Sequence, residues 1–457
     1  MGTLIFKHST DIRSDVHTAF SWHEKEGALQ RLTPPWEKAE LVEKSEGIDV
    51  GAKCTLNVGA GFLTLRWQAE HIEYEKDRHF KDRQNKGPFS LWEHSHDFYA
   101  NDGITTIEDT VEYRLPLHFI SKYIAGSMIK KKLTKMFRYR SSVSKNDIET
   151  IACYKPEPKT IVVSGSSGVV GSALIPYLQT QGHKIIRLVR NEKQLCIGDV
   201  CWNPNAGIVE AQFEHADVVI HLTGEPIGDT RWTEEKKLSI IDSRVKSTSL
   251  LAKTIASMKN PPKLLICASA IGYYGDRGAE ELTEESSAGK EFISDVCSRW
   301  EESAKQAEEA GVRVVYLRIG VALSPSGGAL ERTYKPASLG LGTVLGSGEQ
   351  YLSWVAMDDV LYSMTHIMET ESIKGAVNLT APNPVKWKEY ADTLSAVMHR
   401  PRFLRVPAWL IKAVYGQMGD EVLLASARVY PKKLLESGFT FRYPLLDDAL
   451  KHLLGRQ

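Results

Sequence analysis

A glycine-rich turn joins an apolar stretch to a helical pattern in this chain, and this combination is compatible with few folds. Residues 161–163 read Ile-Val-Val, as a short buried strand does, and the helical pattern begins near Val170. Gly165, Gly168 and Gly171 follow the spacing G-x-x-G-x-x-G. Such a turn lets pyrophosphate approach the backbone, and the helix N-terminus supplies free N–H groups and a positive dipole end. The stretch predicts a dinucleotide site; a tight turn without a ligand is the alternative.

The end of the next predicted strand, 184–189, indicates which dinucleotide binds. A site that prefers NAD usually carries Asp or Glu there to hold the ribose 2′-hydroxyl. This chain has Arg190, which suits a 2′-phosphate, so we predict NADP(H); a solvated loop arginine is the alternative. The predicted cofactor-binding residues are Gly165, Ser166, Ser167, Gly168, Val169, Val170, Gly171, Arg190, Leu222, Thr223, Gly224, Glu225 and Ser269.

Strands alternate with helices after the glycine turn, as in a doubly wound parallel sheet. Strands are predicted at 217–222, 263–268 and 313–319, and helices at 233–258 and 292–310. We therefore predict an α/β Rossmann-type doubly wound parallel sheet with a small C-terminal lobe. The predicted boundaries are 159–380 for the NAD(P)-binding Rossmann domain and 381–457 for the substrate-side lobe.

Residues 1–140 carry a different pattern, with one strand, a short helix, alternating stretches and a helix from Leu117 past Phe137. This order predicts an α+β helix-grip domain, followed by a polar linker at 141–158. The segment resembles the START-like (SRPBCC) superfamily, which implies an apolar pocket and hence a small apolar ligand. The matching motifs are Pro34-Pro35-Trp36, Trp92-x-His94-x-His96 and Asp109-x-x-x-Tyr113-x-x-Pro116.

His94 and His96 lie two residues apart and share one face of a strand. They are candidates for lining a ligand pocket; an ordinary polar strand face is the alternative. A metal site needs a third ligand, which the sequence does not identify, so none is predicted.

Composition limits the partners. Lys plus Arg equals Asp plus Glu at 57 each, which gives no bulk attraction to nucleic acid or anionic membrane. The six cysteines form no C-x-x-C pair and indicate reduced thiols in a cytoplasmic protein. No apolar run approaches the roughly 18 residues of a transmembrane helix.

Residues 159–457 resemble the atypical extended short-chain dehydrogenase/reductases, within them the epimerase-like subfamily (SDR family 39U-like, nucleoside-diphosphate-sugar epimerase-like). The resemblance implies a Rossmann domain, a small C-terminal substrate lobe and NADP(H) binding. The matching stretches include Trp202-Asn203-Pro204, His221 to Glu225, Arg231-Trp232-Thr233, Asp242-Ser243-Arg244, Ser269 to Gly275, Gly346-Ser347-Gly348, Ser353-Trp354-Val355 and Gly438-Phe439-x-Phe441.

The same resemblance raises a difficulty, because the wider family works with Ser, Tyr and Lys. Its Tyr and Lys positions fall on Ile293 and Cys297 here, its Ser on Ala270 and its Asn on Arg244. Tyr-dependent ketone reduction is therefore doubtful. The remaining catalytic candidates are Ser269, Tyr273, Tyr274 and Arg244.

We expect an NADP(H)-binding oxidoreductase-like or epimerase-like protein that acts on an unknown small-molecule substrate, with an apolar-ligand domain before it. A non-catalytic NADP(H)-binding sensor or scaffold is the alternative, and so is a cofactor domain that works together with the N-terminal ligand.

Overall fold

The computed structural model describes residues 3–60, 63–115, 124–190, 193, 195–209, 213–402 and 404–456. The chain divides into two compact units. The first comprises Met1–Glu157 and Pro176–Gly182, and the second comprises Pro158–Ile175 and His183–Gln457.

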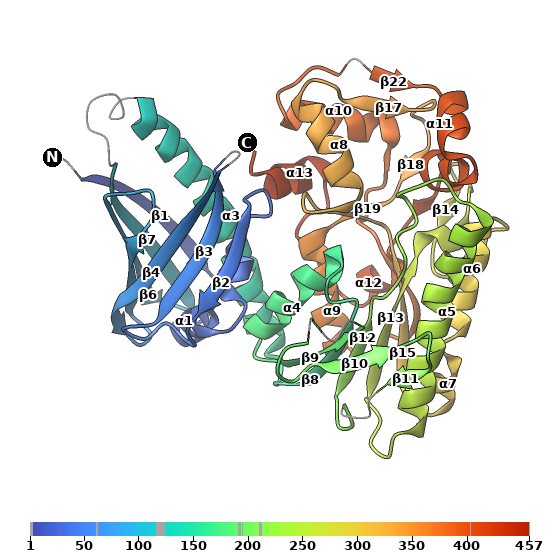
Figure 1. Ribbon diagram of the computed structural model, residues 1–457, viewed down its shortest axis with the longest axis horizontal. Coiled ribbons are helices and arrows are strands. Elements are labelled where there is room, and N and C mark those ends of the chain that lie inside the picture. Colours follow the sequence, from blue (N-terminus) through green and yellow to red (C-terminus); the bar gives the residue numbers. More distant parts are fainter. Residues whose placement is uncertain are drawn as a thin grey trace. The chain divides into compact units, whose positions relative to one another are not determined.

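The first unit is built on a seven-stranded antiparallel sheet of order β1-β7-β6-β5-β4-β3-β2. The long helix α3 lies along this sheet (Figure 1) and buries Leu133 and Phe137 against Trp92 and Val111. The order of elements is the expected one, whereas membership of the START-like superfamily stays a prediction. The elements are β1 (Leu4–Ile12), α1 (Val16–Glu24), α2 (Ala28–Arg31), β2 (Ala39–Lys44), β3 (Lys53–Ala60), β4 (Leu63–Glu75), β5 (His79–Lys86), β6 (Leu91–Asn101), β7 (Ile104–Arg114) and α3 (Ile124–Tyr154).

Helix α3 corrects the predicted linker at 141–158, because residues 141–154 are helical. Val143 and Ile148 are fully buried there, and the Asp147 carboxylate accepts a 2.8 Å hydrogen bond from the buried Arg31. These contacts stabilise a stretch that is polar in composition. The predicted start of the helix at Leu117, like Pro116 of the third motif, lies outside the described residues.

The second unit contains an eight-stranded sheet of order β11-β10-β9-β8-β12-β13-β15-β20, parallel except for the β10–β11 pair. The predicted doubly wound Rossmann-type sheet is therefore confirmed. Its elements are β8 (Thr160–Ser164), α4 (Val169–Thr180), β9 (Lys184–Val189), β10 (Val200–Asn203), β11 (Ile208–Val209), β12 (Val218–His221), α5 (Glu234–Ser257), β13 (Leu264–Ala270), α6 (Phe292–Glu302), α7 (Lys305–Glu309), β15 (Arg313–Ile319), α9 (Met357–Glu369) and β20 (Gly375–Leu379).

The strand order reverses between β8 and β12, which are neighbours although β9, β10 and β11 intervene in the sequence. Helix α4 lies on one face of the sheet, and α5, α6 and α7 lie on the other (Figure 1). Open α/β sheets bind ligands outside the carboxyl ends of their strands at such a switch point. The fold thus directs attention to the residues that follow β8 and β12.

The predicted C-terminal lobe, 381–457, is joined to earlier segments by three two-stranded sheets: β14–β23, β17–β22 and β18–β21. It is therefore no separate body, and it lies within the second unit. The predicted helix 292–310 is also interrupted between α6 and α7. The remaining elements are a 3₁₀ turn η2 (Ile271–Tyr274), β14 (Glu281–Leu282), β16 (Val321–Leu323), α8 (Gly328–Ser338), β17 (Thr343–Leu345), β18 (Tyr351–Leu352), β19 (Trp354–Ala356), β21 (Val385–Lys386), α10 (Trp387–Val397), β22 (Leu404–Val406), α11 (Ala408–Tyr415), a π-helical turn η3 (Gly419–Leu424), β23 (Arg428–Val429), α12 (Lys432–Glu436) and α13 (Leu446–Leu454).

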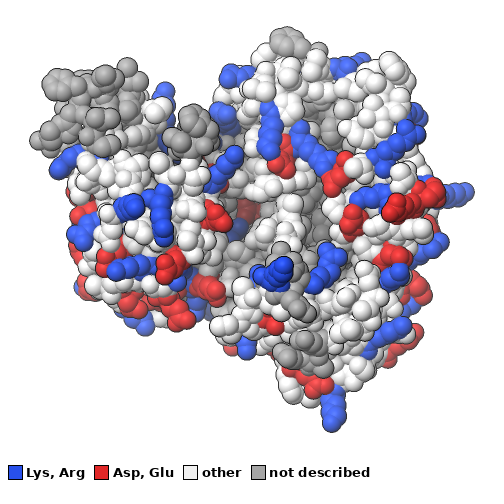
Figure 2. Space-filling model, in the orientation of Figure 1, with Lys and Arg blue, Asp and Glu red and all other residues white. Residues whose placement is uncertain are grey.

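Charged side chains of both signs are interspersed over the face of the molecule that Figure 2 shows. This agrees with the equal numbers of acidic and basic residues. Among the described residues, no helix combines the length and the apolar character that crossing a membrane requires.

Candidate functional site

The glycine turn forms a tight cradle after β8. Gly165 has a φ of +75°, and a Cβ there would lie 2.8 Å from the backbone carbon of Leu222, which follows β12. A Cβ on Gly171 would lie 2.3 Å from the carbonyl oxygen of Gly165. Only glycine therefore fits both positions. Ser167, Gly168 and Val169 are exposed, so the N-terminal edge of α4 is open to a ligand.

Thr223 supplies an unpaired polar group beside this cradle. Thr223 is 7% exposed, and its hydroxyl is buried without a hydrogen-bond partner among the described residues. A buried hydroxyl normally has a partner, so this one is suited to accept or donate to a ligand held at the turn. The neighbouring Leu222 contributes the backbone against which Gly165 packs.

Two arginines lie near the end of β9, Arg187 within the strand and Arg190 directly after it, and their surroundings differ. Arg187 is held by Asp199, whose carboxylate accepts a 2.9 Å hydrogen bond from Arg187 Nε. Arg190 is exposed, and within the described ranges it has no hydrogen bond or ion pair. Its charge is thus available for an anionic group, and its role in cofactor binding stays a prediction.

Beneath the cradle lies a buried network centred on His221, the last residue of β12. Its Nδ1 lies 2.6 Å from Ser164 Oγ, and its Nε2 lies 3.0 Å from Thr248 Oγ1. Trp300 Nε1 donates a 3.0 Å hydrogen bond to the same Thr248 hydroxyl. This network joins the ends of β8 and β12 to the helices on one face and fixes the floor of the site.

We expect His221 to make the protein less stable in acid. Burial lowers the pKa of His221 to about 3, whereas an unfolded histidine has a pKa near 6.5. Below pH 6.5 the unfolded chain therefore binds a proton that the folded chain does not, and the free energy of unfolding falls as the pH falls. Between pH 6.5 and 5 the wild type should lose about 2 kcal/mol through this group. Urea unfolding midpoints of the wild type and His221→Gln measure this; parallel pH profiles would contradict it.

Arg244, a predicted catalytic residue, lies against the loop that follows Thr223. It is 9% exposed, and Nη2 donates a 3.0 Å hydrogen bond to the carbonyl oxygen of Glu225. Its guanidinium carbon lies 4.9 Å from the centroid of the Trp300 ring. A Cβ on Gly224 would lie 3.2 Å from that guanidinium. Arg244 thus positions the 223–225 segment, and Gly224 gives it room.

Ser269 and Tyr274 belong to a buried network around an ion pair that the sequence did not reveal. Arg318 and Glu301 form this pair, with Nε–Oε1 and Nη2–Oε2 distances of 2.8 Å. Ser269 donates a 2.7 Å hydrogen bond to Glu301 Oε1. The Tyr274 hydroxyl accepts a 3.0 Å hydrogen bond from Arg318 and donates to Asn378 at 2.7 Å.

Tyr274 is fully buried, and burial raises the pKa of its hydroxyl to about 12. Its proton is committed to Asn378, so its contacts serve the fold, and we do not retain Tyr274 as a proton donor. Tyr273 is partly exposed, and the Arg318 guanidinium carbon lies 3.4 Å from its ring centroid. Of the two tyrosines, Tyr273 remains the catalytic candidate.

The positions of the wider family's Tyr and Lys are apolar and closed. Ile293 and Cys297 are 4% and 1% exposed on α6. A Cβ on Gly272 would lie 2.9 Å from Ile293 Cγ1 and 3.7 Å from Cys297 Sγ, so both side chains pack against the turn that carries Tyr273. Burial raises the pKa of the Cys297 thiol to about 12, which keeps it protonated at neutral pH.

Glu301, Arg318 and His221 have structural roles at this site that we did not predict. A signal for two of them was present, because Arg318 and His221 are polar residues at the ends of otherwise apolar strands. Such residues need buried partners. The identity of those partners depends on packing between α6 and β15, which single-sequence patterns do not encode.

In the first unit, His94 and His96 are buried side chains of β6. Next to them is a cavity of about 20 Å³, which has room for about one water molecule. Polar and apolar atoms contribute about equally to its lining, which comprises Thr10, His23, Leu32, His96, Ile107, Asp109, Arg140, Ser141 and Ser144. A cavity of this size is too small for the apolar ligand that the START-like resemblance implies.

Comparison with known proteins gives consistent matches. Residues 161–379 match the model of the NAD dependent epimerase/dehydratase family, and residues 406–453 match a domain of unknown function, DUF1731. An epimerase family protein of Mycobacterium bovis is 36% identical over 301 residues, which cover 65% of this chain and 98% of the relative.

The solved structures that are similar to this chain include two with 30% identity or more. The nucleoside-diphosphate sugar epimerase from Corynebacterium glutamicum has 32% identity and a TM-score of 0.82, covering 99% of this chain and 91% of its own. The human epimerase family protein SDR39U1 (isoform 2), solved with NADPH, has 30% identity and a TM-score of 0.60, covering 64% of this chain and 98% of its own. The bacterial structure thus shares both units, and the human one shares the second.

Proposed function

The chain belongs to the NAD-dependent epimerase/dehydratase family, and on that basis we propose that it binds NADP(H) at the 165–171 turn and Arg190. The observation that carries this proposal is the cradle itself. Gly165 and Gly171 leave no room for a side chain, and the hydroxyl of Thr223 lies beside them without a partner among the described residues. The related human protein was solved with NADPH, which supports the choice of cofactor.

The roles of the residues follow from their positions. The backbone of residues 166–170 at the N-terminus of α4 would hold the pyrophosphate, and Arg190 would pair with the 2′-phosphate. Leu222, Thr223, Gly224 and Glu225 would border the cofactor at the end of β12, with Ser269 at the end of β13. The nicotinamide, when bound, supplies or accepts a hydride.

Arg190→Ala tests the cofactor proposal. A charge-assisted hydrogen bond contributes about 1.5–3 kcal/mol, so the variant should bind NADPH about 10- to 100-fold more weakly. NADH has no 2′-phosphate, so its affinity should stay the same. Fluorescence titrations of both nucleotides measure this, with Arg187→Ala as a control because Asp199 already holds Arg187. No saturable NADPH binding by the wild type, or a preference for NADH, would contradict it.

The proposed activity is that of an oxidoreductase-like or epimerase-like enzyme on a small-molecule substrate, with Tyr273 as its remaining proton donor. The buried Ile293 and Cys297 favour a second candidate, a non-catalytic NADP(H)-binding sensor or scaffold. NADPH absorbance assays with carbonyl and nucleotide-sugar substrates separate the two. Turnover that Tyr273→Phe abolishes supports the enzyme; no turnover by a protein that binds NADPH supports the sensor.

We further propose that residues 1–140 form a START-like ligand-binding domain and that the chain works in the cytoplasm. The sheet and long helix support the first point, and six free cysteines support the second. The cavity of about 20 Å³ beside His96 is too small to hold an apolar ligand. Mass spectrometry of the purified protein tests this point, and detection of a bound lipid would support an apolar ligand.

A further inference from the structure

We propose that the first unit binds a divalent transition-metal ion, zinc for preference, through Asp82, His94 and His96. Among the residues that the structure describes, these three form a group that could hold a metal ion, because each offers a ligand atom to the same place. One such atom from each lies within 4.8 Å of the others. Two imidazoles and one carboxylate are a common ligand set for zinc that keeps a fourth position open.

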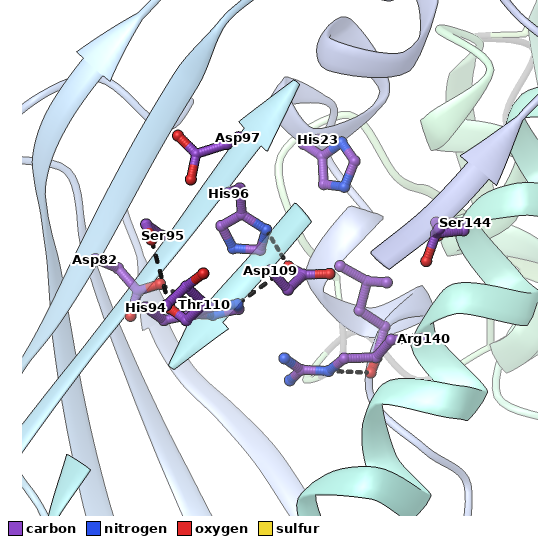
Figure 3. Close-up of polar contacts among 12 residues, drawn as sticks. His23, Asp82, His94, Ser95, His96, Asp97, Asp109, Thr110, Arg140 and Ser144 are labelled. Carbon is purple, nitrogen blue, oxygen red and sulfur yellow. Dashed lines mark hydrogen bonds and ion pairs between the residues drawn. The ribbon is translucent and has the colours of Figure 1, made fainter. Parts of the chain in front are cut away.

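The register of the antiparallel sheet places these side chains together. Asp82 on β5 is directly opposite His94 on β6, and His96 is directly opposite Asp109 on β7. His94 and His96 are buried positions that alternate with partly exposed ones and therefore point to the same side of the sheet. Figure 3 shows His96 and Asp109 directed at each other from neighbouring strands.

Asp109 fixes the tautomer of His94. His94 Nε2 lies 3.1 Å from Asp109 Oδ1, and a carboxylate only accepts, so Nε2 carries the proton. In the neutral ring, Nδ1 then has a free lone pair. A ligand histidine that donates its other N–H to a carboxylate is the usual arrangement in metal sites, where the carboxylate orients the ring.

The free Nδ1 of His94 faces Asp82 Oδ2 at 3.6 Å. This separation is longer than a hydrogen bond. It matches the spacing of two ligand atoms on a tetrahedral zinc, which is about 3.4 Å for metal–ligand distances near 2.1 Å. A metal ion between these two facing acceptors would bind both of them.

His96 is oriented by the same carboxylate as His94. It is 8% exposed, and its Nδ1 lies 2.7 Å from Asp109 Oδ1. The ring stacks on Phe80 with centroids 4.1 Å apart and lies 3.9 Å from the His94 ring. The Asp109 carboxylate and the neighbouring rings hold this imidazole in place, so its other nitrogen, Nε2, is the one positioned to bind a metal.

The net charge around the cluster favours the binding of a cation. Asp82 and Asp109 carry two negative charges, and Arg140, whose Nε donates to the carbonyl oxygen of Leu32, supplies one positive charge beside the cavity. With neutral histidines the net charge is therefore negative, and a divalent ion would make it positive. The remaining metal position would then suit water or a small anion.

Isothermal titration of the chelator-treated full chain with Zn²⁺ at pH 7.5 tests this proposal. The wild type should bind one Zn²⁺ and should gain thermal stability from it, whereas Mg²⁺ should not bind. Asp82→Asn and His94→Gln should each weaken Zn²⁺ binding at least 100-fold. Asp109→Asn should weaken it about 10- to 100-fold, because Asp109 orients the ligand.

The double variant His17→Gln with Asp77→Asn is the matched control, because this exposed pair has a similar 3.1 Å contact on the same unit. Its Zn²⁺ affinity should equal that of the wild type. Asp82 is only partly buried, so Asp82→Asn should fold, and far-UV circular dichroism verifies this. Absence of stoichiometric Zn²⁺ binding, or equal binding by Asp82→Asn, would overturn the proposal.

Discussion

Gly171→Ala is expected to abolish NADPH binding, with an affinity loss of about 100-fold or more. A Cβ at this position would lie 2.3 Å from the carbonyl oxygen of Gly165, and the nearest atoms all belong to the backbone of the turn. The turn must therefore open, which displaces the N–H groups that face the pyrophosphate. Two or three charge-assisted hydrogen bonds of about 1.5–3 kcal/mol each account for the size of the effect.

A matched control exists in the same unit. A Cβ on Gly228 meets nothing within 4 Å, so Gly228→Ala should bind NADPH like the wild type. Alanine is also the better helix former, so without the clash Gly171→Ala would be neutral or stabilising in α4. NADPH affinity that survives in Gly171→Ala would show that the turn does not hold the cofactor.

Glu301→Ala is expected to lower the free energy of unfolding of the second unit by about 3–5 kcal/mol. The side chains of Arg318 and Glu301 are 5% and 13% exposed. Removal of the carboxylate leaves the guanidinium buried without its counter-ion, and it also takes away the acceptor of the Ser269 hydroxyl. Tyr273 and Tyr274 pack on Arg318 and should lose their fixed positions with it.

Asp295→Ala serves as the comparison, because Asp295 pairs with Arg299 on the exposed side of the same helix. Exposed pairs contribute about 0–1 kcal/mol. Urea unfolding followed by tryptophan fluorescence should therefore separate the two variants clearly. Equal midpoints would mean that the Glu301–Arg318 pair is not a support of the site.

Local patterns predicted the second unit well. Strands β9 and β15 have the predicted bounds, and Thr233 caps α5 by accepting a hydrogen bond from the Lys236 N–H. Apolar runs bounded by glycines, together with capping residues, fix such elements locally. The predicted Rossmann-type sheet followed from them, because alternating strands and helices allow few other topologies.

Long-range pairing explains what the sequence did not predict. The third residue of the proposed metal site, Asp82, is opposite His94 only because of the register between β5 and β6. Likewise, residues 141–154 are polar in composition, and they are helical because Val143 and Ile148 pack in the interior. The edge strand β2 pairs with β3 alone and carries a weak alternation, so it was not predicted.

A crystal structure with NADPH is the most direct test of the central claim that the turn after β8 holds this cofactor. We expect the pyrophosphate against the backbone N–H groups of residues 166–170, the 2′-phosphate on Arg190 and the nicotinamide beside Tyr273, with no contact to Ile293 or Cys297. A cofactor bound elsewhere, or a 2′-phosphate that points away from Arg190, would contradict it.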